Sequence, residues 1–299
     1  MNNKLIIFSK FFLLILIFYY LFENNHLDIS FITVLRNNIF LNFWFFILIL
    51  STLLLGSYRW LIILKNSNIK IKFFDVFKII YICSFFNNFM FGNIGGDVLR
   101  VFYATKISKN NKLKNGFTVL IDRVFGLIGL ICLGIISYLF ILFDAKEFQT
   151  IFYILFILFI LFFCIYLFRF FFIKNKKIKT LIDFFSLNIN LFIVGVLISI
   201  ILFFTVHLTI FFISNKIFLF NIEISYIFFA NFISSLAGAL PLTPGGIGLS
   251  EASFVFINKN IFKVYLENLA NIIIYYRILI FIFSVPSLYF FFNYKKIKL

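Results

Sequence analysis

The chain has 299 residues, of which 63% are hydrophobic and only 13% are charged, and its formal net charge is +16. A soluble domain carries roughly 25% charged residues, so this composition excludes a soluble globular protein and predicts an integral membrane protein. The basic residues lie in short loops between apolar runs, which indicates contact with anionic lipid headgroups and no binding of nucleic acid.

Six apolar runs are long enough to cross the roughly 30 Å hydrocarbon core as helices. In chain order they are residues 5–22, 42–64, 117–143, 151–173, 192–219 and 269–292. Two further apolar segments, 75–98 and 223–258, are interrupted by glycines. We therefore predict an all-α, polytopic helical bundle, with residues 1–299 forming a single membrane domain.

Lysine and arginine are concentrated in three loops and at the two ends of the chain. The loops are residues 59–78, 100–114 and 169–179. Because basic loops stay in the cytoplasm, we expect a multi-pass protein of the bacterial inner (plasma) membrane with both termini cytoplasmic. The segment 75–98 is then flanked by cytoplasmic loops, whereas 223–258 begins and ends outside. This predicts two re-entrant segments that enter from opposite faces; a plain bundle of about eight spans is the alternative.

The order of span, re-entrant segment and span occurs twice, in residues 42–143 and 192–292. The two units would have opposite polarity, and inverted repeats of this kind are typical of transporters whose site lies at broken helices. No residue-by-residue repeat accompanies the pattern, so the inverted repeat is a prediction from topology alone.

The two interruptions carry most of the polar chemistry of the chain. "FGNIGGDVLR" begins at Phe91, and "PLTPGGIGLSEA" begins at Pro241. Glycines allow close approach and positive φ, and a helix that starts at such a turn offers its N-terminal amides to an anion such as a phosphate headgroup. Two glycine-rich loops at the membrane interface are the alternative. The candidate binding residues here are Gly95, Gly96, Asp97, Arg100, Thr243, Pro244, Gly245, Gly246, Gly248 and Glu251.

Three more charged residues lie inside apolar runs, namely Asp122, Arg123 and Arg277. Charges at that depth are costly unless they are paired, so they mark a functional site or an interhelical ion pair. We expect Arg277 to pair with Glu251 or Asp97, and Arg123 with Asp97. Asn87, Asn88 and Asn231 lie near the two interruptions and are candidates to line the same cavity. The chain shows no metal-ligand set and no catalytic constellation, so we expect no cofactor, no metal and no catalytic residue.

The stretches "GNIGGDVLRVFYATK", "VLIDRVFGLIGL" and "LPLTPGGIGLSEASFVF" resemble, in order and spacing, a known family. It is the lysylphosphatidylglycerol synthase transmembrane region family, also called uncharacterised protein family 0104 or flippase-like domain proteins. The resemblance covers roughly residues 10–292, and it departs at Phe91, where members often have proline. It implies a polytopic plasma-membrane protein, and the matching region of bifunctional members looks like a lipid flippase. No synthetase domain is present in the sequence, so lysyl transfer is not expected.

The residues and the resemblance together favour a translocator for a lipid or a lipid-linked glycan. Its headgroup would lie between the two glycine-rich loops, and we expect a transporter rather than an enzyme. The alternative is an integral-membrane transferase, or an accessory subunit of one, that acts on a lipid-linked substrate. The expected partners are membrane lipids, either an anionic phospholipid or a polyprenyl-linked glycan, and in addition a second copy of the chain or a partner synthase.

Overall fold

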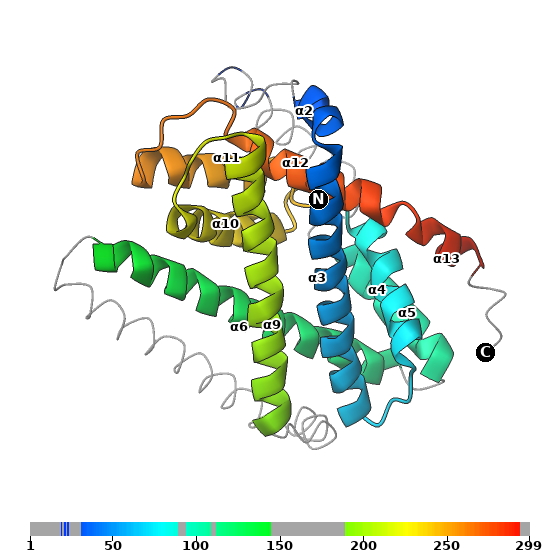
Figure 1. Ribbon diagram of the computed structural model, residues 1–299. Coiled ribbons are helices and arrows are strands. Elements are labelled where there is room, and N and C mark those ends of the chain that lie inside the picture. Colours follow the sequence, from blue (N-terminus) through cyan, green and yellow to red (C-terminus); the bar gives the residue numbers. More distant parts are fainter. Residues whose placement is uncertain are drawn as a thin grey trace, which may run out of the picture.

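The computed structural model describes residues 31–88, 94–108, 112–144 and 189–293, together with Tyr19, Leu21 and Glu23. Within these residues the secondary structure is helical and contains no strand, as predicted (Figure 1). The helices are α2 (Phe31–Asn37), α3 (Ile39–Asn66), α4 (Phe73–Asn87), α5 (Ile94–Ser108), α6 (Lys112–Asp144), α9 (Ile189–Phe212) with the π-helical turn η1 (Ile213–Ile217), α10 (Ile224–Ala239), α11 (Leu249–Phe256) with the π-helical turn η2 (Ile257–Ile261), α12 (Ala270–Ser284) and α13 (Ser287–Asn293).

Four stretches of helix in the described part of the chain are long and apolar enough to cross a membrane. They are Ile39–Asn66, Lys112–Leu142, Asn190–Ile217 and Ala270–Asn293. They confirm the spans predicted at 42–64, 117–143, 192–219 and 269–292, while those predicted at 5–22 and 151–173 lie outside the described residues. The last span bends at Pro286 between α12 and α13, because proline cannot donate the backbone hydrogen bond that continues a helix.

The outer faces of α3 and α9 are apolar, as the lipid-facing surface of a bundle must be. Phe40, Phe43 and Trp44 on α3 are exposed, and so are Leu197 and Ile201 on α9. The two helices pack side by side in the middle of the molecule (Figure 1). In a soluble protein such a surface would aggregate, whereas in a bilayer it contacts acyl chains.

Both interrupted segments form pairs of short helices that pack against each other. The first pair is α4 with α5, and the second is α10 with α11. The 15 residues of α4 and of α5, and the 16 of α10, rise about 22–24 Å at 1.5 Å per residue, which is less than the hydrocarbon core. Each of these helices is too short to cross the hydrocarbon core alone, and the entry and return of each pair on one face of the membrane remains a prediction.

The order of helices repeats along the chain. A long span, a pair of short helices and a second span occur as α3, α4–α5 and α6, and again as α9, α10–α11 and α12. The two repeat units at 42–143 and 192–292, and their opposite polarity across the membrane, remain predictions.

Candidate functional site

A cavity of about 590 Å³ lies where the two interrupted segments meet. Its walls come from α3, α4, α5, α6, α9, α10, α12 and the loop between α10 and α11. Gly245 of that loop packs on the end of α4, because a Cβ added at Gly245 would lie 2.9 Å from the carbonyl oxygen of Asn88. Two segments far apart in sequence therefore form one site.

The second loop depends on glycine for its shape. Gly245, Gly246 and Gly248 have φ values of +57°, +70° and +86°, in the left-handed region that side chains with a Cβ disfavour. Gly246 also packs on the backbone of Gly238, where an added Cβ would lie 2.3 Å from the carbonyl oxygen. The loop is thus pressed against α10 on one side and α4 on the other.

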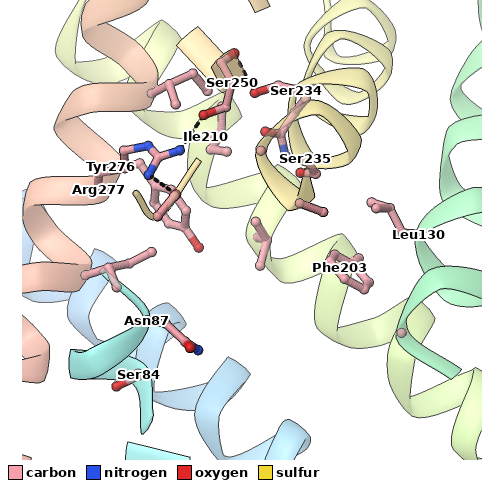
Figure 2. Close-up of a pocket in the computed structure, with 18 of the residues that line it drawn as sticks. Ser84, Asn87, Leu130, Phe203, Ile210, Ser234, Ser235, Ser250, Tyr276 and Arg277 are labelled. Carbon is pink, nitrogen blue, oxygen red and sulfur yellow. Dashed lines mark hydrogen bonds between the residues drawn. The ribbon is translucent and has the colours of Figure 1, made fainter. Parts of the chain in front are cut away.

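Arg277 of α12 holds this loop in place (Figure 2). Its Nη1 and Nη2 donate to the carbonyl oxygens of Gly245 and Gly246 at 2.7 and 3.1 Å, and Nη2 also bonds the Oγ of Ser250. Its Nε forms an ion pair of 2.6 Å with Oε1 of Glu251, which is fully buried. The predicted pairing of Arg277 with Glu251 is confirmed, and the guanidinium mainly fixes the loop.

A buried group of charges lies on the opposite side of the cavity. Oδ1 of Asp122 on α6 accepts a 2.6 Å bond from Nε of Arg59 on α3, and Oδ2 accepts a 2.8 Å bond from Nη2 of Arg100 on α5. Arg59 also donates to Oγ of Ser199 on α9 at 2.8 Å, and the Arg100 guanidinium lies 4.3 Å from the ring centre of Trp60. Asp122 therefore ties together helices that are remote in sequence.

The pair of Asp97 and Arg123 lies beside this group and is more accessible. Nε and Nη2 of Arg123 donate to the two carboxylate oxygens of Asp97 at 2.9 and 3.0 Å, which confirms the predicted pair. Arg100 Nη1 also lies 3.6 Å from Oδ1 of Asp97. The Arg123 side chain is 44% exposed, whereas that of Asp122 is 4% exposed.

Some of the predicted site residues line the cavity, and the others lie beside or behind it. Asp97, Asp122, Arg123, Gly245 and Arg277 line the cavity, as do Asn87, Asn88 and Asn231. Arg100 lines a smaller cavity of about 210 Å³ beside it. The other predicted residues lie in the loop before α11 or in the first turns of α5 and α11: Thr243, Gly246, Gly248 and Glu251 are buried, Gly96 is buried, and Pro244 and Gly95 are half-buried.

The backbone amides of Gly96, in the first turn of α5, and of Gly248, directly before α11, already have acceptors. Gly96 N donates to Oδ1 of Asn87 at 2.9 Å, and a Cβ at Gly96 would clash with that same side chain. Gly248 N donates to Oε2 of Glu251 at 2.7 Å, as in a capping box. The expected anion site on helix N-terminal amides is thus occupied by the chain itself at these two positions, which leaves guanidinium groups as the charged donors.

Arg59 was not expected in the site. The sequence places it in a basic loop at 59–78, but it lies in α3, is 9% exposed and bonds Asp122. Arg100 is likewise a buried helical residue and not part of a loop. The available signal was the position of Arg59 inside the predicted span 42–64, where a charge needs a partner.

These features define a multi-pass helical membrane protein with a charged cavity between two pairs of short helices. The family model described as the lysylphosphatidylglycerol synthase TM region matches residues 6–287, so the chain belongs to this family. A UPF0104 membrane protein of Methanocaldococcus jannaschii is 31% identical over 177 residues, which cover 55% of this chain and 75% of that relative. No solved structure matches the chain. The expected family is thereby confirmed.

Proposed function

We propose that this protein moves a lipid with an anionic headgroup across the membrane. The headgroup would occupy the 590 Å³ cavity, while the acyl chains stay in the surrounding lipid. The observation that carries the proposal is a charged cavity where two broken helical segments meet, inside a bundle with an apolar outer surface. Transporters place substrate sites at such breaks, because irregular backbone within a membrane must face protein or a water-filled cavity.

The charge of the cavity wall supports an anionic ligand. Around the buried group, the three guanidinium groups of Arg59, Arg100 and Arg123 face the two carboxylates of Asp97 and Asp122, which leaves one positive charge. On the other side Arg277 is balanced by Glu251. A single negative phosphodiester would neutralise the site.

Neutral polar side chains line the part of the cavity nearer α10. They are Asn231, Ser234, Ser235 and Ser250. Asn231 is 3% exposed, and its Nδ2 has no hydrogen-bond partner among the described residues. A buried donor without an acceptor costs about 1–3 kcal/mol, so a ligand oxygen that accepts this bond would recover that free energy. This favours a headgroup that presents phosphate or hydroxyl oxygens.

The site of action follows from the distribution of basic residues. We place the protein in the plasma membrane with both termini in the cytoplasm, because lysines gather at both ends of the chain and in alternate loops. The lipid would then move between the cytoplasmic and outer leaflets.

Reconstitution in liposomes tests the proposal. Fluorescently labelled phosphatidylglycerol is placed in both leaflets, and dithionite destroys the label in the outer leaflet. We expect the protein to expose inner-leaflet phosphatidylglycerol to dithionite, and labelled phosphatidylcholine to move more slowly. Arg36→Gln, at an exposed position on α2, is the control for loss of an arginine.

Two results would refute translocation. One is movement of labelled phosphatidylglycerol no faster than in protein-free liposomes. The other is conversion of the lipid to a new covalent product, seen by mass spectrometry of the same samples, which would favour the transferase alternative.

A further inference from the structure

We propose that Arg123 is the group that binds the headgroup phosphate, and that Asp97 is an internal competitor which occupies Arg123 until the phosphate displaces it. The inference rests on the proposed function for its lipid substrate. The ligand of Arg123 would be the phosphate ester group of a lipid.

Solvent exposure separates Arg123 from the other three guanidinium groups at the two cavities. Arg100 is 7% exposed, is bonded to Asp122 and lies against Trp60. Arg59 is bonded to Asp122 and Ser199. Arg277 holds Glu251 and two loop carbonyls. The Arg123 side chain is 44% exposed and pairs with Asp97, whose side chain is 25% exposed.

The Asp97–Arg123 ion pair lies where the two cavities meet, so a headgroup that moves from one cavity to the other would contact it. The 590 Å³ and 210 Å³ cavities share six lining residues, Arg59, Ser84, Asn87, Asp97, Asp122 and Arg123. The larger cavity continues toward α10 and α12, and the smaller one toward Thr52, Leu53 and Leu202 of α3 and α9. A headgroup that moves between the cavities therefore meets the Asp97–Arg123 pair.

The exchange leaves no charge without a partner. When Arg123 turns to a phosphate, Asp97 keeps Arg100, whose Nη1 lies 3.6 Å from Oδ1. The two parallel bonds that Arg123 now makes to a carboxylate can be made equally to two phosphate oxygens. An ion pair as exposed as this one is weak, so a phosphate can compete with it.

The proposal predicts opposite effects for the two partners of one ion pair. Asp97→Asn removes the competitor, so the purified protein in detergent should bind short-chain phosphatidylglycerol about three- to fivefold more tightly than the wild type. Arg123→Gln removes the binding group, so binding should be lost. Short-chain phosphatidylcholine and the variant Arg36→Gln are the controls, and calorimetry gives the affinities. A merely structural pair would weaken binding to a similar extent in both variants, and that result would overturn the proposal.

A measurement on the wild-type protein avoids any effect of the substitutions on folding. Phenylglyoxal modifies accessible arginines, and peptide mass spectrometry locates them. Short-chain phosphatidylglycerol should protect Arg123 and leave the modification of Arg36 unchanged. Unchanged modification of Arg123 would overturn the proposal, and protection by inorganic phosphate at equal concentration would assign the site to free phosphate and overturn the lipid assignment.

The two proposals fail in different ways. Transport of labelled phosphatidylglycerol by a protein whose Arg123 is not protected would refute the role of Arg123 and leave translocation intact. Protection of Arg123 in a protein that moves no lipid would refute translocation and support the phosphate site.

Discussion

Replacement of Asp122 by asparagine tests whether the buried charge group holds the bundle together. The change keeps the size of the side chain and removes its charge, which leaves Arg59 and Arg100 facing each other at 9% and 7% exposure. Removing one partner of a buried ion pair costs about 3–5 kcal/mol, because the remaining charge is no longer compensated. Native proteins are stable by only about 5–15 kcal/mol, so the loss is a large part of the total.

The unfolding temperature measures this loss. At about 2 °C per kcal/mol for a chain of this size, Asp122→Asn should lower the temperature by roughly 6–10 °C. A maleimide dye that fluoresces on reaction with thiols reports unfolding in detergent, since Cys83 is buried. The matched control is Asp97→Asn, the same change at a carboxylate with 25% side-chain exposure, which should cost roughly 2 °C or less. An Asp122→Asn protein that melts together with the control would refute the account of Asp122 as a buried clamp.

Three further substitutions probe the second loop and the cavity, and a fourth, Gly116→Ala on α6, is a control. Arg277→Lys should speed hydrogen exchange of residues 243–251, seen by mass spectrometry, because the acceptors surround three nitrogens of the guanidinium and a single ammonium nitrogen cannot reach them all. Unchanged exchange would contradict the role of Arg277 as the loop anchor. Gly246→Ala should lower the unfolding temperature by the equivalent of at least about 2 kcal/mol, since φ is +70° and the added Cβ meets backbone. Gly116→Ala should raise it slightly, because nothing lies within 4 Å of a Cβ there, and equal shifts for both glycines would oppose this reasoning. Asn231→Leu should leave stability equal or higher while it slows lipid movement in liposomes, whereas a less stable variant would mean that the Asn231 amide is already satisfied.

The membrane fold could be predicted from the sequence because hydrocarbon imposes a simple rule. A run of apolar residues long enough to cross the bilayer forms a helix, and a polar, glycine-rich interruption favours a break between helices. Residues 42–64 therefore lie in α3, the run 192–219 lies in α9–η1 up to residue 217, and the glycine at 245 lies in a loop. The same rule indicated the pairs of Asp97 with Arg123 and Glu251 with Arg277, since charges inside apolar runs need partners.

The composition of the buried charge group could not be predicted, because hydropathy treats each helix separately. Arg59 lies in the last two turns of α3, close to Lys65 and the basic loop that follows, so a count of charges along the chain groups it with residues that face water. Only the packing of α3 against α6 and α9 shows that its side chain turns inward to Asp122 and Ser199.

The packing of α6 against α9 depends on small residues on both helices. A Cβ at Gly129 of α6 would lie 2.4 Å from the Cβ of Ser199, and one at Gly195 of α9 would lie 2.3 Å from the ring of Phe125. Helices in membranes approach closely where such residues meet, and the approach sets which polar groups come within bonding distance. The glycines at 129 and 195 lie inside runs predicted as complete spans, and in the structure they allow the contact that brings Ser199 to Arg59. Close backbone approach between α6 and α9 therefore brings Ser199 within bonding distance of Arg59, which in turn bonds Asp122. Arg123, one residue further along α6, lines the cavity with a side chain that is 44% exposed.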